Sequence, residues 1–272
     1  MPSLVKASVG FECVACALED HVATITLNRP ERRNALNYRA YDELEKALRL
    51  AASDPDVRCV IVTGADPAFC SGDDVGEIMA GPKSVNARAI QASVTYTATP
   101  AAIAALECDK PLIAAVNGAA VGWGMELALF ADIRIASEKA RFGELFVKRG
   151  LVCDVGGFYR LPAVVGPAKA AELLFTGDIF DAAEALRIGL VSEVTSHADL
   201  MHRARAMAAR IAANPPLAVR HLKAGLNRYA YGDPREIGAW AIEKIRLLMQ
   251  TEDHKEGVAS FLEKREPHFQ GR

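Results

Sequence analysis

The sequence predicts an α/β fold built from stacked strand–turn–helix units. Three short apolar runs, at 59–63, 111–116 and 133–136, have the pattern of strands that are covered on both faces. The order strand, glycine turn, helix recurs loosely at 59–78 and 112–130. Because the C-terminal half is mainly helical in pattern, strands and helices combine as they do in α/β cores.

The N-terminal part predicts a hairpin followed by a helix. Segments 11–18 and 22–28 are apolar runs separated by a short polar turn, and the second alternates as a half-buried strand does. Asn37 can cap a helix over 38–52. Asp181 begins a capping box for a later helix.

Composition places the chain among soluble globular proteins. Its 272 residues (29.2 kDa) are 51% hydrophobic and 24% charged, with a net charge of −2. The lack of a basic excess argues against nucleic-acid binding, and no apolar run approaches the roughly 18 residues of a membrane span. The N-terminus lacks the features of a secretory signal, so we expect a cytoplasmic protein without membrane contact.

The cysteines and the familiar cofactor motifs point away from disulfide, nucleotide and metal sites. The six cysteines are scattered, and the CxxC of Cys13 and Cys16 falls in a predicted strand, where the two side chains point to opposite faces. We therefore expect buried or half-buried free thiols. A dinucleotide fingerprint fails at Leu127, there is no P-loop or HExxH motif, and Ser71 is not in a GxSxG sequence.

Two glycine-containing turns, 69–74 and 118–124, each follow a predicted buried strand. Glycine lets the backbone approach a ligand closely, and such turns can direct N–H groups outward. Two N–H groups from neighbouring strand ends can hold a developing oxyanion. Taken alone, each turn is more simply a tight turn without a ligand.

Two acids stand alone among apolar and small residues. Glu126 follows the second glycine turn directly, at the start of an otherwise apolar helix, and Asp154 comes 28 residues later. A carboxylate in such surroundings is costly unless it is paired or used. Either the acids have a catalytic role, or Glu126 is a cap or an arginine partner and Asp154 is a helix cap.

Four segments in order resemble the signature of one family. They are 28–37 (NRPERRNALN), 68–74 (AFCSGDD), 110–136 (KPLIAAVNGAAVGWGMELALFADIRIA) and 256–265 (EGVASFLEKR). Through these segments, from about residue 11 to 270, the chain resembles the enoyl-CoA hydratase/isomerase (crotonase) superfamily.

The resemblance implies a crotonase-like spiral of ββα units with a C-terminal helical trimerisation region. It implies an acyl-CoA substrate, a homotrimer or hexamer, and no metal or other cofactor beyond the coenzyme A of the substrate. We expect an acyl-CoA-binding core over 1–199 and a helical oligomerisation region over 200–272, whose apolar residues need a partner surface. These apolar residues include Ile237, Trp240, Ile245 and Leu248.

The resemblance also implies binding residues. The oxyanion hole would be the backbone N–H groups of Asp73 and Trp123. The family usually has glycine at the second position, so the indole must turn away from the thioester, and we expect it to line the acyl pocket. Residues that match coenzyme A contacts, the last two often from a neighbouring subunit, are Arg33, Ala65, Gly72, Phe261 and Lys264.

The family's two hydratase glutamates are only half matched. Glu126 matches the first, but Phe146 stands at the second position and would line the acyl pocket. Glu144 is two residues short, and on a strand it would lie on the same face but about 6–7 Å away. Asp154 matches a working aspartate of dienoyl-CoA isomerases, some ring-isomerising members and related dehalogenases. The catalytic candidates are therefore Glu126 and Asp154.

Two reactions remain open at this point. One is hydration or dehydration of a 2-enoyl-CoA through an enolate held in the oxyanion hole, and the other is double-bond isomerisation of an enoyl- or dienoyl-CoA by Glu126 and Asp154. Lower alternatives are a CoA-binding member with little catalysis, and a thioester hydrolase or dehalogenase with Asp154 as nucleophile.

Overall fold

Residues 4–79, 99–229, 247–248 and 250–272 are described by the computed structural model of the chain. Three of the residues expected to form the partner surface lie outside these ranges: Ile237, Trp240 and Ile245. Among the described residues, no helix is both long enough and apolar enough to cross a membrane.

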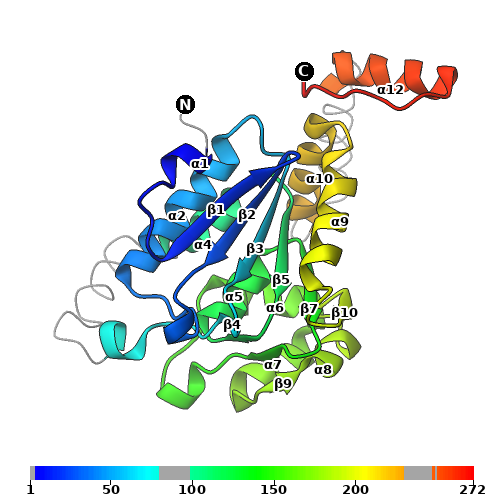
Figure 1. The fold of residues 1–272 in the computed structure, drawn as a ribbon. Helices are drawn as coiled ribbons and strands as arrows, with labels where there is room; N and C mark the ends of the chain where they lie inside the picture. The colour runs from blue at the N-terminus through cyan, green and yellow to red at the C-terminus, as the bar shows by residue number, and fades with distance from the viewer. Residues whose placement is uncertain (1–3, 80–98, 230–246, 249) are drawn as a thin grey trace.

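Two sheets form the centre of the described fold (Figure 1). The larger has six strands in the order β1-β2-β3-β5-β7-β10, and the smaller has four in the order β4-β6-β8-β9. The larger sheet consists of β1 (Val14–Glu19), β2 (Val22–Leu27), β3 (Cys59–Gly64), β5 (Leu112–Val116), β7 (Ile133–Ser137) and β10 (Glu193–Thr195). The smaller sheet consists of β4 (Ala68–Cys70), β6 (Ala119–Val121), β8 (Arg141–Gly143) and β9 (Phe180–Asp181).

The chain alternates between the two sheets, and this alternation produces a spiral. Strands β3, β5 and β7 lie side by side in the larger sheet, and each is followed by a strand of the smaller sheet, β4, β6 or β8. Successive turns pair in parallel, for example Val60 with Leu112 in the larger sheet and Ala119 with Arg141 in the smaller. The predicted α/β spiral of ββα units is confirmed, while trimerisation through the C-terminal helices stays a prediction.

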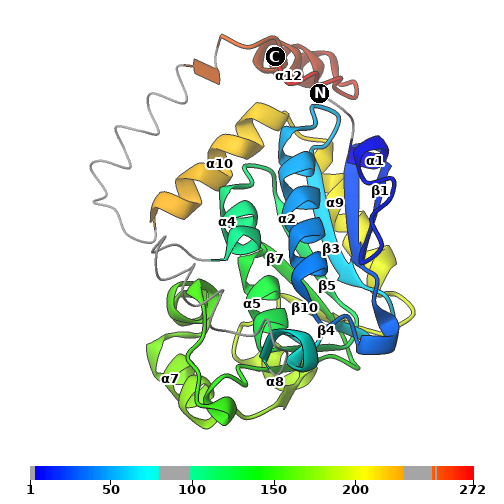
Figure 2. The same cartoon turned by 90° about the vertical axis from the view of Figure 1, so that its left-hand side faces the viewer.

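Helices cover the larger sheet on both faces (Figure 2). The main ones are α2 (Tyr38–Ser53), α4 (Pro100–Glu107), α5 (Trp123–Phe130) and α9 (Leu200–Ala212). The others are α1 (Leu4–Ala7), α6 (Leu161–Val165), α7 (Pro167–Thr176), α8 (Ala182–Arg187), α10 (Pro216–Tyr229) and α12 (Glu252–Glu263). Single-turn helices are η1 (Pro30–Arg32), η2 (Val75–Met79), η3 (Val147–Arg149) and η4 (Gly156–Arg160).

The core has one apolar cluster on each face of the larger sheet. Val60 and Val62 of β3 belong to the cluster that contains α2, α4 and α5, whereas Ile61 between them belongs to the cluster with Ala204 and Ala208 of α9. This alternation is the period of two that a strand covered on both faces requires. Helix α9 therefore belongs to the core, and the division between 1–199 and 200–272 stays a prediction.

Local sequence signals explain several element boundaries. β1 and β2 form the predicted hairpin, and Asp20 and His21 in its turn have φ values of 46° and 64°. Asn37 caps α2, because its side-chain oxygen accepts the N–H of Ala40 at 2.9 Å. Asp181 caps α8 in the same way. All six cysteines are free thiols, as predicted.

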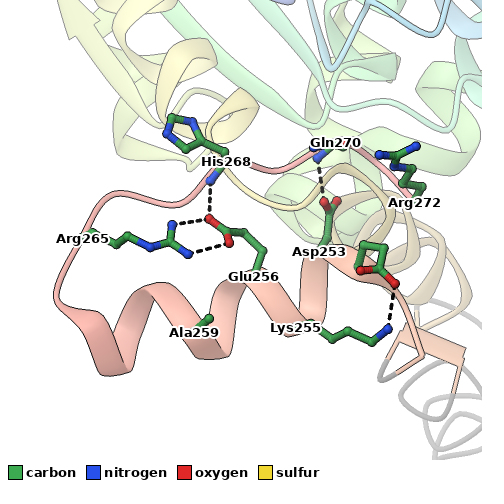
Figure 3. A pocket seen from close by; sticks show the side chains of 9 residues that line it. Asp253, Lys255, Glu256, Ala259, Arg265, His268, Gln270 and Arg272 are labelled. Carbon is green, nitrogen blue, oxygen red and sulfur yellow. Dashed lines mark hydrogen bonds and ion pairs between the residues drawn. The ribbon is translucent and has the colours of Figure 1, made fainter.

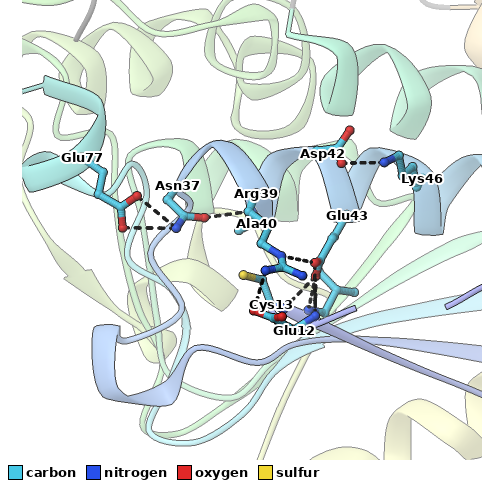
Figure 4. Close-up of polar contacts among 10 residues, drawn as sticks. Glu12, Cys13, Asn37, Arg39, Ala40, Asp42, Glu43, Lys46 and Glu77 are labelled. Carbon is cyan, nitrogen blue, oxygen red and sulfur yellow. Dashed lines mark hydrogen bonds and ion pairs between the residues drawn. The ribbon is translucent and has the colours of Figure 1, made fainter. Parts of the chain in front are cut away.

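Glu43, a buried residue of α2, holds the chain where it enters β1 (Figure 4). Its carboxylate accepts three backbone N–H groups at 2.7–3.2 Å, those of Glu12, Cys13 and Val14. Arg39 donates to the same carboxylate at 2.8 Å. Burial raises the pKa of Glu43, but these hydrogen bonds outweigh burial and hold the pKa below its usual value.

We predict that Glu43→Gln destabilises the protein by about 2–3 kcal/mol, because it removes the charged acceptor of several buried N–H groups. The folded-state pKa lies below the unfolded value, so this stability is present at neutral pH and is lost as pH falls through the folded-state pKa. Urea unfolding at neutral and acidic pH measures the effect. The control is Asp42→Asn, an exposed residue that pairs with Lys46; an equal cost for both variants would show that Glu43 is not an anchor.

Candidate active site

The two predicted glycine turns lie side by side at the ends of β4 and β6, which are parallel neighbours. Gly72 has a φ of +85°, and a Cβ on it would stand 2.8 Å from the carbonyl oxygen of Val121 and 3.3 Å from the nitrogen of Trp123. A Cβ on Gly124 would stand 2.0 Å from the carbonyl oxygen of Cys70. Only glycine lets the two turns approach so closely.

The predicted oxyanion-hole residues, Asp73 and Trp123, belong to these adjacent turns. Trp123 is the first residue of α5, so its N–H has no acceptor within the helix and lies at the positive end of the helix dipole. Asp73 follows Gly72, and its carboxylate accepts a hydrogen bond from the hydroxyl of Tyr41 at 2.6 Å. The structure brings the two residues together, and their action on an oxyanion stays a prediction.

Glu126 lies on the first turn of α5 and is fully buried. Its carboxylate accepts three backbone N–H groups, those of Asp154 (2.7 Å), Gly156 (2.8 Å) and Gly157 (3.1 Å). A Cβ on Gly156 would stand 2.7 Å from Oε2 of Glu126, so this approach also needs glycine. Within the described residues the hydrogen bonds to this carboxylate come from backbone amides and none comes from an arginine, so of the two alternative roles, cap or arginine partner, only the cap is compatible with the structure.

The environment of Glu126 brings the pKa of its carboxyl group close to neutral pH. Burial, and then the negative charge of Asp154, raise the pKa of Glu126 to about 7, although the amides of Gly156, Gly157 and Asp154 favour the ionised form. A general base is most effective when its pKa lies near the working pH. Glu126 is therefore suited to take up and release a proton.

Asp154 is half-buried and is engaged through both carboxylate oxygens. Its Oδ2 accepts hydrogen bonds from the hydroxyl of Thr99 and from the indole N–H of Trp123, the latter at 3.4 Å. Its Oδ1 accepts the N–H of Val155 at 2.8 Å. Asp154 thus stabilises the turn that it begins, and it also holds the side chain of Trp123.

The indole of Trp123 is packed inside the molecule. It meets Tyr41 edge-on with ring centroids 4.9 Å apart, and Phe130 with centroids 5.9 Å apart. Its N–H also reaches Oγ1 of Thr99 at 3.2 Å. The ring therefore lies beside Asp154, and its expected place in the wall of the acyl pocket stays a prediction.

Glu144 is a buried acid that the sequence argument set aside. β8 ends at Gly143, so Glu144 lies in the following turn and the strand spacing used to place it does not apply. It is 1% exposed, and burial followed by the charge of Glu126 raises its pKa well above the usual value. The lone-acid argument made for Glu126 applies equally to Glu144, which stands between apolar residues, and would have found it. Phe146 is half-buried and packs against the main core.

Three of the residues predicted to contact coenzyme A lie close to the glycine turns. Gly72 belongs to the first turn, and the N–H of its neighbour Ser71 donates to the carbonyl of Arg33 at 3.1 Å. The side chain of Asn34 then donates to the carbonyl of Ala65 at 2.7 Å. Hydrogen bonds therefore connect the segments that carry Arg33, Ala65 and Gly72.

Lys264 lies away from these segments. It follows α12, which Figures 1 and 2 show at the end of the molecule opposite to β4 and α5. Phe261 lies in the same helix, and its side chain is outside the described set. Within a single chain, Lys264 does not reach Glu126 or Asp154.

A cavity of about 530 Å³ lies beside α12, away from Glu126 and Asp154 (Figure 3). Its charged groups largely satisfy one another: Arg265 pairs with Glu256, and Asp253 accepts the N–H of Gln270 at 2.6 Å. These contacts tie the last residues to α12. Among the described residues, no group of three or more His, Cys, Asp or Glu side chains is arranged to hold a metal ion. The residues around Glu126 are therefore the candidate active site.

Comparison with known proteins agrees with this geometry. The model of the enoyl-CoA hydratase/isomerase family matches residues 17–272. The chain belongs to this family. The family resemblance and the enzyme class predicted from the sequence are confirmed.

Known relatives align with this chain over nearly its whole length. The chain is 36% identical over 263 residues to the crotonyl-CoA hydratase of Syntrophomonas wolfei, and the alignment covers 96% of this chain and 99% of that protein. It is 39% identical over 249 residues to the short-chain-enoyl-CoA hydratase of Clostridium acetobutylicum, covering 91% and 93%. The crystal structure of an enoyl-CoA hydratase from Bacillus anthracis matches with a TM-score of 0.89 at 33% identity, covering 96% and 100%.

We predict that Gly156→Ala lowers turnover of an enoyl-CoA ester by about 100-fold or more, since small displacements of reacting groups cost that much. The added Cβ would stand 2.7 Å from Oε2 of Glu126 and must push the carboxylate aside. Steady-state kinetics of the folded variant measures the loss. The control is Gly76→Ala, whose Cβ meets, among the described residues, Oδ1 of Asp74 at an ordinary 3.5 Å. Full activity of folded Gly156→Ala would contradict the site.

Proposed function

We propose that the chain is an enoyl-CoA hydratase that adds water to the double bond of a 2-enoyl-CoA thioester. The observation that carries the proposal is the carboxylate of Glu126, which is buried, held by three backbone amides, and has a pKa of about 7. It stands one turn of α5 from the N–H of Trp123. Addition of water to the double bond of an enoyl thioester needs a general base and N–H donors close to each other, and both are present here.

The reaction follows from these parts. The thioester carbonyl oxygen binds between the N–H groups of Asp73 and Trp123, and each donor contributes about 3–4 kcal/mol to stabilising the oxyanion that develops. Glu126 takes a proton from water while the water oxygen forms a bond to C3. The electron pair of the C2=C3 bond moves into the enolate. Protonation at C2 then restores the carbonyl and completes the addition of water.

Relatives that align with more than nine-tenths of the chain are named as hydratases of crotonyl-CoA and of short-chain enoyl-CoA esters. Their names support hydration and a short acyl chain as the first substrate to test. The packed indole of Trp123, in place of a glycine, also favours a narrow acyl pocket.

Double-bond isomerisation is the second candidate, and the nearness of Asp154 to Glu126 favours it. Two acids near one acyl chain can take a proton from one carbon and deliver it to another. Hydration is preferred because Asp154 already accepts hydrogen bonds from Thr99, Trp123 and Val155. The same bonds make Asp154 a poor nucleophile, so thioester hydrolysis or dehalogenation has the least support. The remaining alternative is a family member that binds coenzyme A but has little catalytic activity. A Glu126 that can gain and lose a proton near neutral pH argues against this alternative.

We predict that Glu126→Gln lowers kcat for hydration of crotonyl-CoA by about 10²–10⁴-fold, the usual contribution of a general base. Asp154→Asn should leave hydration within about tenfold if Asp154 only positions Trp123, whereas an isomerase would lose as much as with Glu126→Gln. Because only ionised Glu126 accepts a proton, wild-type kcat should rise as pH rises through about 7. Equal and full activity of both amide variants would contradict the assignment.

We further infer a cytoplasmic homotrimer or hexamer that needs no cofactor beyond the coenzyme A of its substrate. Two features support an oligomer. Lys264 directly follows α12, which lies at the opposite end of the fold from α5 and its Glu126, so a neighbouring chain must supply this lysine if it binds coenzyme A. Leu222 and Leu226 of α10 are 67% and 73% exposed in one chain, which is costly without a partner surface.

We predict that analytical ultracentrifugation at micromolar concentration gives a trimer or hexamer. Lys264→Ala should raise KM for crotonyl-CoA about tenfold and leave kcat nearly unchanged, since it removes one ion pair with a phosphate far from the reacting carbons. The matched control is Lys255→Ala, an exposed lysine of α12 that pairs with Glu252. A monomer with full activity, or no difference between the two variants, would overturn this arrangement.

A further inference from the structure

Glu144 is a buried carboxyl that the reaction described above does not use. It follows β8, the neighbour of β6 in the smaller sheet, and β6 leads directly into α5. The turn that carries Glu144 is therefore next to the turn that leads to Glu126. Neither carboxyl oxygen of Glu144 has a hydrogen-bond partner among the described residues, and the residue is 1% exposed.

These surroundings determine the protonation of Glu144. Glu144 is shielded from solvent and has no hydrogen-bond donor among the described residues, and an ionised carboxylate in such a place costs several kcal/mol, so the group stays in its neutral form. Glu126 has the opposite surroundings, because three amides are directed at its two oxygens. Above the pKa of Glu126 the pair therefore holds one proton, and that proton is on Glu144.

The other groups around the pair do not change this assignment. Asp154 contributes a negative charge next to Glu126. The thiol of Cys153 lies among the three acids, and burial raises its pKa to about 12, so it remains neutral. Within the described part of the chain, Glu126 is the one charged group that acts on the pKa of Glu144. A negative neighbour keeps Glu144 protonated.

We propose that Glu144 is the second carboxyl of the reaction, a neutral acid that gives its proton to C2 of the enolate. The proposal rests on hydration as the proposed function. The water oxygen bonds to C3 and one water proton goes to Glu126, while the electron pair at C2 takes the proton of Glu144. The net result is the addition of one water molecule across the double bond, in which the proton that reaches C2 comes from Glu144 and one water proton stays on Glu126. Transfer of the proton from Glu126 to Glu144 restores the starting state.

This role accounts for Phe146. The family resemblance places the second glutamate at position 146, where this chain has a phenylalanine that packs on the core. Because β8 ends at Gly143, the turn and not a strand directs Glu144, and an acid two residues earlier supplies the missing carboxyl.

Glu144→Gln tests the proposal, because glutamine keeps the size of the side chain but has no carboxylic proton to give. With crotonyl-CoA we expect kcat to fall about 10²–10⁴-fold and KM to change little. The melting temperature should stay or rise, since no described hydrogen bond is lost. The control is Glu138→Gln, an exposed acid in the turn between β7 and β8, which should keep full activity.

Infrared difference spectroscopy of the unliganded protein gives a second readout that does not depend on turnover. The wild type above neutral pH should show the carbonyl band of a protonated carboxyl group, and Glu144→Gln should lack it. A wild type without this band overturns the proposal, even where the glutamine variant fails to fold. An active wild type with fully active Glu144→Gln overturns the role of Glu144 alone. A wild type that does not hydrate enoyl-CoA esters overturns the proposed function and this role with it.

Discussion

A carboxylate without access to water must be held by hydrogen-bond donors, and in this chain the backbone supplies them to Glu126. Two consecutive glycines let the start of η4 approach the first turn of α5 until their amides reach the carboxyl oxygens. This single contact joins segments 30 residues apart and fixes both the position and the proton affinity of the group. The arrangement at Glu43 follows the same physical rule, with three amides and an arginine around one buried carboxylate.

The spiral explains why the other parts of the site are nearby. Strands β4, β6 and β8 are parallel neighbours, so the segments that follow them start from the same edge of the smaller sheet. These segments carry Gly72 and Asp73, then Trp123 and Glu126, then Glu144. Three successive turns of one spiral thus deliver the candidate oxyanion donors, the base and the second acid. Short strands suffice, because only their ends have to be aligned.

Much of this could be predicted from sequence, because the relevant signals are local. The buried strands, the cap at Asn37 and the two glycine turns depend on neighbouring residues, and Glu126 stands out as an acid in an apolar helix. Glu144 stands out in the same way, but its place relative to Glu126 depends on where β8 ends, which a three-residue strand does not reveal. The bonds from Asp154 to Thr99 and Trp123 join separate segments, and no spacing in the sequence encodes them.

The central claim is that Glu126 activates water and does not simply move protons between carbons. Proton NMR of crotonyl-CoA incubated with the wild-type protein in D2O tests this most directly. The account predicts 3-hydroxybutyryl-CoA that carries one deuterium at C2 and none at C4. Deuterium at C2 or C4 of an unhydrated or shifted alkene, with no hydroxyl product, would contradict it.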